Sequence, residues 1–144
     1  MTPSRTLACW MASVCLASLS ACSSQAPAPG CAHADITAEQ LVGTWQVTLD
    51  GEKAPWTLVL RPHPEHEGSL RGALMQNPRH LAVVADIEDG ELTMEESHDG
   101  QRIAATWLGQ VQAGSCGQLI RGERLKGSSG PGPQGFEMRR AGLR

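Results

Sequence analysis

The sequence has no tyrosine and one phenylalanine, and its aromatic content is 3% of 144 residues. It also lacks a basic excess: 12 Lys and Arg stand against 15 Asp and Glu, which gives a net charge of −3 at pH 7. A strongly basic surface is typical of nucleic-acid binding, so we expect no nucleic-acid partner. The G-x-S-x-G motif of one large hydrolase class is absent as well.

The N-terminus lacks the run of about 20 apolar residues that a membrane-spanning helix needs. Residues 7–21 are uncharged and mostly apolar or small, and they follow a short segment with one positive charge at Arg5. This order of charged, apolar and small residues is typical of a secretory signal peptide. We therefore interpret residues 1–21 as a signal peptide rather than as a membrane anchor or a cytosolic core helix.

The end of this stretch, Leu19-Ser20-Ala21-Cys22, resembles the lipobox of bacterial lipoproteins. The resemblance implies cleavage before Cys22, a diacylglycerol on its sulfur and an acylated amino group, which together anchor a small domain to a membrane. Ser23 stands where an Asp would favour the inner membrane, so the resemblance implies the outer membrane of a Gram-negative bacterium. Residues 22–34 then comprise the lipidated cysteine and a flexible tether, in which Pro27 and Pro29 favour an extended backbone.

The lipoprotein resemblance also changes the cysteine count. Cys9 and Cys15 leave with the signal peptide, and Cys22 carries the lipid. Cys31 and Cys116 remain, in a compartment that favours disulfides. We predict a disulfide between them, and two free thiols or a metal-binding pair are the alternatives.

The remaining residues, 35–144, alternate apolar and polar residues in about eight short segments. Thr37-Ala38-Glu39-Gln40 fits a capping box and predicts a short helical turn before the first segment. Asp89-Gly90 and Asp99-Gly100 predict tight hairpin turns, and residues 127–135 read as a flexible loop. The expected strands lie within residues 41–50, 56–61, 69–74, 81–88, 91–95, 103–111, 117–125 and 136–139.

Eight strands at this spacing predict an all-β domain, a small antiparallel meander closed as a barrel or packed as a sandwich. Gly43-Thr44-Trp45, after the helical turn, resembles the G-x-W opening of lipocalin-like barrels, where this motif closes the barrel base. Avidin-type barrels and the periplasmic metalloprotease-inhibitor barrels begin in a similar way. The chain is smaller than a typical lipocalin and the later lipocalin signatures are not evident, so the resemblance implies no particular ligand.

Three tryptophans, Trp45, Trp56 and Trp107, are predicted to face inward. They are the candidate ligand-binding residues, because indoles often line a cavity for a small apolar ligand. The alternative is that they fill the core. We favour the filled core, since strands this short enclose little interior volume.

Several polar residues are of types that can bind metals, catalyse reactions or contact charged partners. His63, Glu65, His66 and Glu67 are of the types that bind zinc or copper, with His80 or His98 as a further ligand. Their spacing matches no recognised metal site, so we predict a solvated loop, no metal and no cofactor. The remaining candidates have plainer interpretations: a turn serine (Ser115), an acidic hairpin end (Asp86, Glu88, Asp89 and Glu91) and a charged chain end (Arg139, Arg140 and Arg144). Contact of these arginines with anionic lipid or a partner is the alternative.

With no catalytic set in view, we expect a non-enzymatic function at the cell envelope. The first hypothesis is a membrane-anchored protein-binding module, either an accessory of an envelope assembly or an inhibitor or immunity protein. The alternative is a lipocalin-like carrier of a small apolar ligand held by the three tryptophans. The known lysozyme-inhibitor lipoproteins depend on Tyr-containing motifs, and the lack of tyrosine argues against that family.

Overall fold

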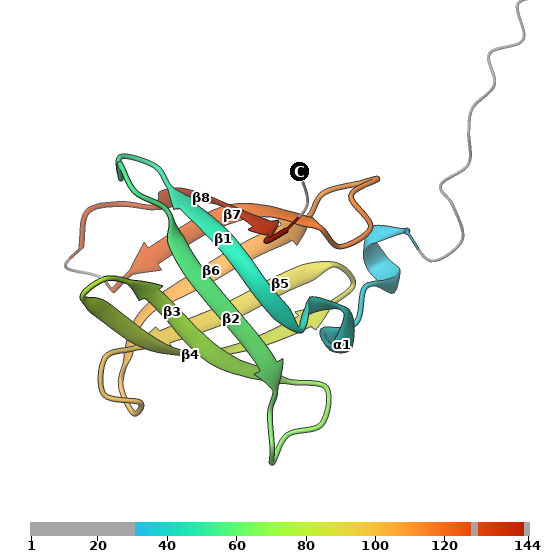
Figure 1. The fold of residues 1–144 in the computed structure, drawn as a ribbon, viewed down its shortest axis with the longest axis horizontal. Helices are drawn as coiled ribbons and strands as arrows, with labels where there is room; N and C mark the ends of the chain where they lie inside the picture. Colours follow the sequence, from blue (N-terminus) through green and yellow to red (C-terminus); the bar gives the residue numbers. More distant parts are fainter. Residues whose placement is uncertain (1–30, 128–129, 143–144) are drawn as a thin grey trace, which may run out of the picture.

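A computed structural model describes residues 31–127 and 130–142 of the chain. The expected signal peptide, Cys22 and most of the tether lie outside these residues, as does Arg144. The described chain forms one closed antiparallel barrel in which each strand pairs with the next and β8 pairs with β1 (Figure 1). The all-β meander expected from the sequence is confirmed, and it closes as a barrel rather than packing as a sandwich. No helix in the described ranges is both long and apolar enough to span a membrane.

The barrel is preceded by two short helical segments, of which the capping-box pattern predicted the second, α1. The backbone N–H of Thr37 donates to Gln40 Oε1 (2.8 Å), which is the glutamine half of that box. The elements in chain order are η1 (His33–Asp35), α1 (Ala38–Leu41), β1 (Gly43–Leu49), β2 (Trp56–Pro62), β3 (Leu70–Gln76), β4 (Arg79–Glu88), β5 (Glu91–Ser97), β6 (Ile103–Val111), β7 (Leu119–Lys126) and β8 (Gln134–Arg140).

Alternation along each strand explains why the chain has one common core, and the pairing of β8 with β1 closes the sheet around it. In β1, Trp45, Val47 and Leu49 are buried while the residues between them are exposed. Side chains on alternate positions of a strand face opposite sides of the sheet, so one face of every strand enters a common core. Closure also pairs every strand on both edges, which removes the free edge that would otherwise favour aggregation.

Some strands are longer than the sequence pattern predicted. β3 and β4 extend to Gln76 and Arg79, so that Asn77 and Pro78 alone connect them. β8 begins at Gln134, inside the stretch expected to be a loop, because Gln134 pairs with Arg124 of β7. The cross-strand partner therefore decides these boundaries, and a single-strand pattern does not contain it.

The two ends of the barrel differ, and both are visible in Figure 1. At one end lie α1, the loops at residues 63–69 and 112–118 and the turn at residues 89–90; we call this the helix end. At the other lie the loops at residues 50–55 and 98–102, the turn at 77–78 and the described residues between β7 and β8 (127 and 130–133); we call this the far end. Between them a single apolar cluster fills the interior.

Candidate functional site

The three tryptophans of the described chain all lie in the barrel core. Trp45 and Trp107 have no exposed surface, and Trp56 exposes 3% of its surface. The indole N–H of Trp56 donates to Glu52 (2.8 Å), and that of Trp107 donates to Glu96 (2.8 Å). The inward orientation predicted from the sequence is therefore correct, and these side chains are packed and hydrogen-bonded as buried indoles normally are.

Arg140, the last residue of β8, ties α1 to the barrel at the helix end. Its guanidinium carbon lies 4.7 Å from the ring centroid of Trp45, and its N–H groups donate to the carbonyl oxygens of Gln40 and Val42. The indole N–H of Trp45 in turn donates to the Leu41 carbonyl (2.9 Å). Burial lowers the pKa of Arg140 from its ordinary value, although arginine stays charged in proteins. The interpretation of Arg140 as part of a charged chain end is wrong, because its guanidinium caps carbonyl groups at the end of α1.

Cys31 and Cys116 are joined by a disulfide, with the two sulfur atoms 2.01 Å apart. The bond connects the first described residue to the loop between β6 and β7, which lies at the helix end. The fold therefore brings together the two cysteines that the sequence paired, across 85 residues of chain.

An ion pair lies inside the barrel toward the far end. Glu96 is 1% exposed and Arg124 is 7% exposed, and they are the buried charged residues of the described chain. Arg124 donates from Nε (3.0 Å) and Nη2 to the two carboxylate oxygens of Glu96, and from Nη1 to Gln134 Oε1 (3.3 Å). The guanidinium also lies over Trp107, 5.4 Å from the ring centroid. Both charges are thus paired and hydrogen-bonded, as buried charges must be.

A hollow of about 450 Å³ opens beside this ion pair, a size in the range of small-molecule sites. Arg79 at its rim lies over Trp56, 4.5 Å from the ring centroid, and 3.7 Å from the carboxylate of Glu52. The lining combines buried residues (Trp56, Leu81, Glu96 and Arg124), the half-buried Ala104 and exposed residues (Arg79, His80, His98 and Lys126).

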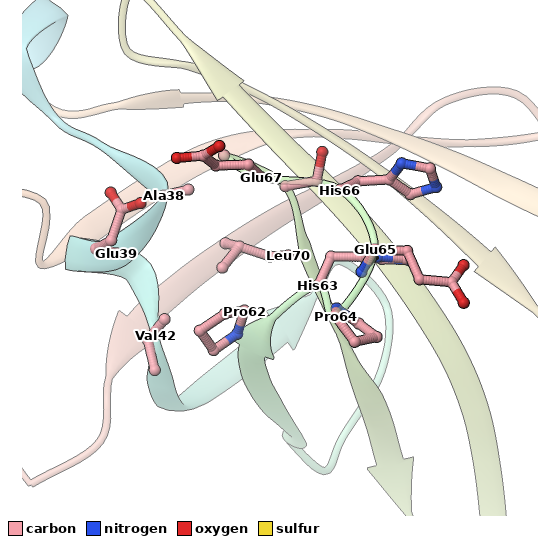
Figure 2. A pocket seen from close by; sticks show the side chains of 12 residues that line it. Ala38, Glu39, Val42, Pro62, His63, Pro64, Glu65, His66, Glu67 and Leu70 are labelled. Carbon is pink, nitrogen blue, oxygen red and sulfur yellow. Dashed lines mark hydrogen bonds between the residues drawn. The ribbon is translucent and has the colours of Figure 1, made fainter.

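A second hollow, of about 360 Å³, lies at the helix end between α1 and the loop after β2. Figure 2 shows Glu39 and Glu67 on the α1 side of this pocket, while Glu65 and His66 point away from α1. His63 and His66 approach each other with ring centroids 4.5 Å apart, and His63 Nδ1 accepts the backbone N–H of Glu65 (3.2 Å). Within residues 31–127 and 130–142, no group of three or more His, Cys, Asp or Glu side chains is arranged to hold a metal ion.

The outer face of β4, β5 and β6 differs from the rest of the described surface. Its three large exposed apolar side chains are Val84 (43% exposed), Ile103 (59%) and Leu108 (48%), and in the described chain these are the exposed large hydrophobic residues. Val84 stands opposite Glu95 of β5, and Leu108 stands opposite Thr93. We call this surface the β4–β6 face.

The Glu96–Arg124 pair is the feature that sequence reasoning missed, although a signal was present. Glu96 continues the inward series of Leu92 and Met94, and Arg124 lies four residues after the buried Ile120. Charged residues near strand ends are usually exposed. The alternation along β5 places Glu96 on the inner surface, and the alternation along β7 places Arg124 there. Both patterns must be combined to predict that the two charges meet.

A comparison with protein-family models found no match, and searches of curated proteins and of solved structures found none either.

Proposed function

We propose that the chain is an exported, lipid-anchored protein-binding module of the bacterial cell envelope, without a catalytic role. Cys22 is the proposed lipid attachment site, and the outer membrane is the proposed location; both rest on the sequence of the first 23 residues. The observation that carries the binding role is the β4–β6 face, which displays apolar side chains where a solvated strand face is normally polar.

The chemistry of this face indicates what kind of partner it fits. Exposed carboxylates border its apolar side chains: Glu95 stands opposite Val84, and Glu123 of β7 stands opposite Leu108. Asp86 adds a third exposed acid opposite Thr93. An apolar centre with an acidic border is complementary to a protein surface that has an apolar centre and basic groups around it.

The packed interior favours protein binding over carriage of an apolar ligand. A carrier needs an empty apolar space, whereas Trp45 and Trp107 have no exposed surface and belong to one buried cluster with the surrounding aliphatic side chains. Trp56 lines the hollow at the far end, but the other residues that line this hollow are mostly polar or charged. The indole N–H groups of all three tryptophans are also engaged within the protein. We therefore propose protein binding rather than carriage of a small apolar ligand.

Site-specific photo-crosslinking tests the binding role in the native envelope. A photoreactive amino acid at position 108 should give one discrete crosslinked product, and the same amino acid at Thr57, an exposed position on β2, should not. Leu108→Asp should weaken recovery of that partner about tenfold, as for loss of a central interface residue, while Thr57→Asp leaves it unchanged. Equal crosslinking from both positions, or none from either, contradicts the proposal.

The anchor has its own test. Cys22→Ala should leave the protein unprocessed or released from the membrane, since the cysteine sulfur is the proposed acylation site. Membrane fractionation with mass spectrometry of the mature N-terminus measures this. A Cys22→Ala protein that matures normally and still partitions with the membrane excludes the lipoprotein assignment, without affecting the crosslinking result.

A further inference from the structure

We propose that the hollow at the far end binds a small anionic molecule that carries a flat apolar group. The chemical class is a carboxylate, sulfonate or phosphate joined to an apolar body. The site is separate from the β4–β6 face, and it depends on neither the lipid anchor nor a protein partner.

The buried ion pair supplies a fixed cationic wall. An arginine side chain has five N–H donors on three nitrogen atoms. Among the described residues, Arg124 uses one N–H of each nitrogen: those of Nε and Nη2 donate to Glu96, and that of Nη1 donates to Gln134. One N–H on each terminal nitrogen of a guanidinium held in this way is left for another acceptor. Because Arg124 lines the hollow, an anion there meets a donor whose position is already set by Glu96 and Trp107.

The charge balance of the hollow also favours an anion. Arg79, Arg124 and Lys126 line it, while its single lining carboxylate, Glu96, already accepts hydrogen bonds from Arg124 and Trp107. Glu52 offsets part of the charge of Arg79 at 3.7 Å. Within the described residues Lys126 forms no ion pair, so the far end keeps a positive excess on a chain of net charge −3. Positive groups gathered in a concave site concentrate anions there.

The rest of the lining accounts for the apolar part of the ligand. Trp56 and Leu81 are buried beneath the rim, and Ala104 is half-buried beside them. Flat apolar groups pack well against an indole, and the Arg79 side chain that lies over Trp56 is 56% exposed, while its guanidinium also donates to Gln76 Oε1, so a ligand would meet this cation at the rim. A cation is a poor fit, since the one carboxylate that lines the hollow has its acceptors occupied.

A matched pair of fluorescent probes tests the site. Anilinonaphthalene sulfonate is a flat apolar amine with a sulfonate, and N-phenylnaphthylamine is the same ring system without it. The sulfonate should bind with a saturable fluorescence increase at one equivalent, and energy transfer from tryptophan to the probe should accompany it. The neutral probe should bind about tenfold more weakly, because charge-assisted hydrogen bonds are lost.

Three variants locate the binding. Arg79→Ala and Lys126→Ala should each weaken sulfonate binding about fivefold, because each removes one rim cation. Arg71→Ala, which removes an exposed arginine from β3 away from this hollow, should leave it unchanged. Near-ultraviolet circular dichroism confirms that each variant keeps the native fold, so that probe binding to unfolded protein is not counted.

Each alternative outcome overturns the proposal. Equal binding of the two probes means an apolar site, and equal weakening by Arg71→Ala means a general surface effect. Absence of saturable sulfonate binding removes the site altogether. Binding to phosphatidylglycerol vesicles without binding of the soluble sulfonate means that the rim cations contact a membrane instead.

Discussion

Each end of the barrel has an arginine that lies over a buried tryptophan, but the two arginines have different hydrogen-bond acceptors. At the helix end Arg140 lies over Trp45, and at the far end Arg124 lies over Trp107. Arg140 donates to backbone carbonyl oxygens of the α1 segment, whereas Arg124 donates to the buried carboxylate of Glu96. One end is thus closed by a cation on neutral acceptors, and the other holds a complete ion pair beside a hollow.

This difference separates the structural role of Arg140 from the ligand-binding role that we propose for Arg124. Carbonyl groups at a helix end need donors in any case, so Arg140 satisfies a requirement that the fold itself creates. A buried ion pair costs desolvation free energy, and apolar residues of similar volume often replace it without loss of stability. We therefore expect that barrel packing does not require the charged pair at the far end.

The largest expected effect follows from breaking the far-end pair. Glu96→Ala should lower the free energy of unfolding by about 3–5 kcal/mol, since it leaves the charge of Arg124 buried without a partner. Urea denaturation followed by tryptophan fluorescence measures the change. The double variant Glu96→Leu with Arg124→Met removes both charges and should recover most of the loss. A double variant as unstable as the single one would mean that the fold itself needs the pair.

The disulfide at the helix end comes next. Cys31→Ser with Cys116→Ser should cost about 2–4 kcal/mol, because an unfolded chain without the crosslink gains conformational freedom. Thermal unfolding with and without reductant compares the two proteins. Reductant should lower the melting temperature of the wild type only. Mass spectrometry of the unreduced mature protein should find neither cysteine available for alkylation, and two alkylated thiols would refute the bond.

Removal of the Arg140 contacts should have a smaller and local effect. Arg140→Met keeps the aliphatic packing on Trp45 but loses the hydrogen bonds to the Gln40 and Val42 carbonyl groups, at about 1–2 kcal/mol. Hydrogen exchange should show faster exchange in α1 and little change at the far end. Arg139→Met is the matched control, because Arg139 is exposed and pairs with Glu137 on the surface. Equal exchange in both variants would contradict the stabilisation of α1 by Arg140.

The smallest effect concerns Asp99 in the far-end loop. Backbone N–H groups of Arg102 and Gln101, with the side chains of Arg102 and Ser97, hold the pKa of Asp99 well below its usual range. A lowered pKa in the folded state adds stability above the unfolded pKa, and this stability is lost as pH falls through the folded pKa. The amide resonances of Gln101 and Arg102 should therefore titrate in strong acid, and Asp99→Asn should abolish that titration. A midpoint near 4, typical of a free aspartate, would contradict it.

The sequence was sufficient for the elements that depend on local alternation. The series Trp45, Val47 and Leu49 identifies a strand with one buried face. The Asp-Gly pairs at 89–90 and 99–100 locate two hairpin connections, the first a two-residue turn and the second a five-residue loop. Such patterns are local, so one strand at a time contains them. The inward tryptophans were predictable for the same reason.

The polar contacts that distinguish the two ends were not predictable in this way. Arg140 lies 95 residues after Trp45 in the chain, and Glu96 and Arg124 come from strands that are not neighbours in the barrel. Their contacts depend on how the barrel closes and on which strands meet across its interior. From the sequence alone, the environments of Arg140 and Arg124 cannot be distinguished, because both depend on how the barrel closes.

The Cys31–Cys116 bond has a mechanical consequence. Without the disulfide, a pulling force applied N-terminal to Cys31 would first unfold η1 and α1 and then separate β1 from β2 and β8. With it, the load passes from Cys31 directly into the loop between β6 and β7, so the helical segments and β1 carry little of it. The strands that take the force, β6 and β7, are each held by hydrogen bonds on both edges. A force applied N-terminal to Cys31 is thereby transmitted to β6 and β7 rather than to the first strand.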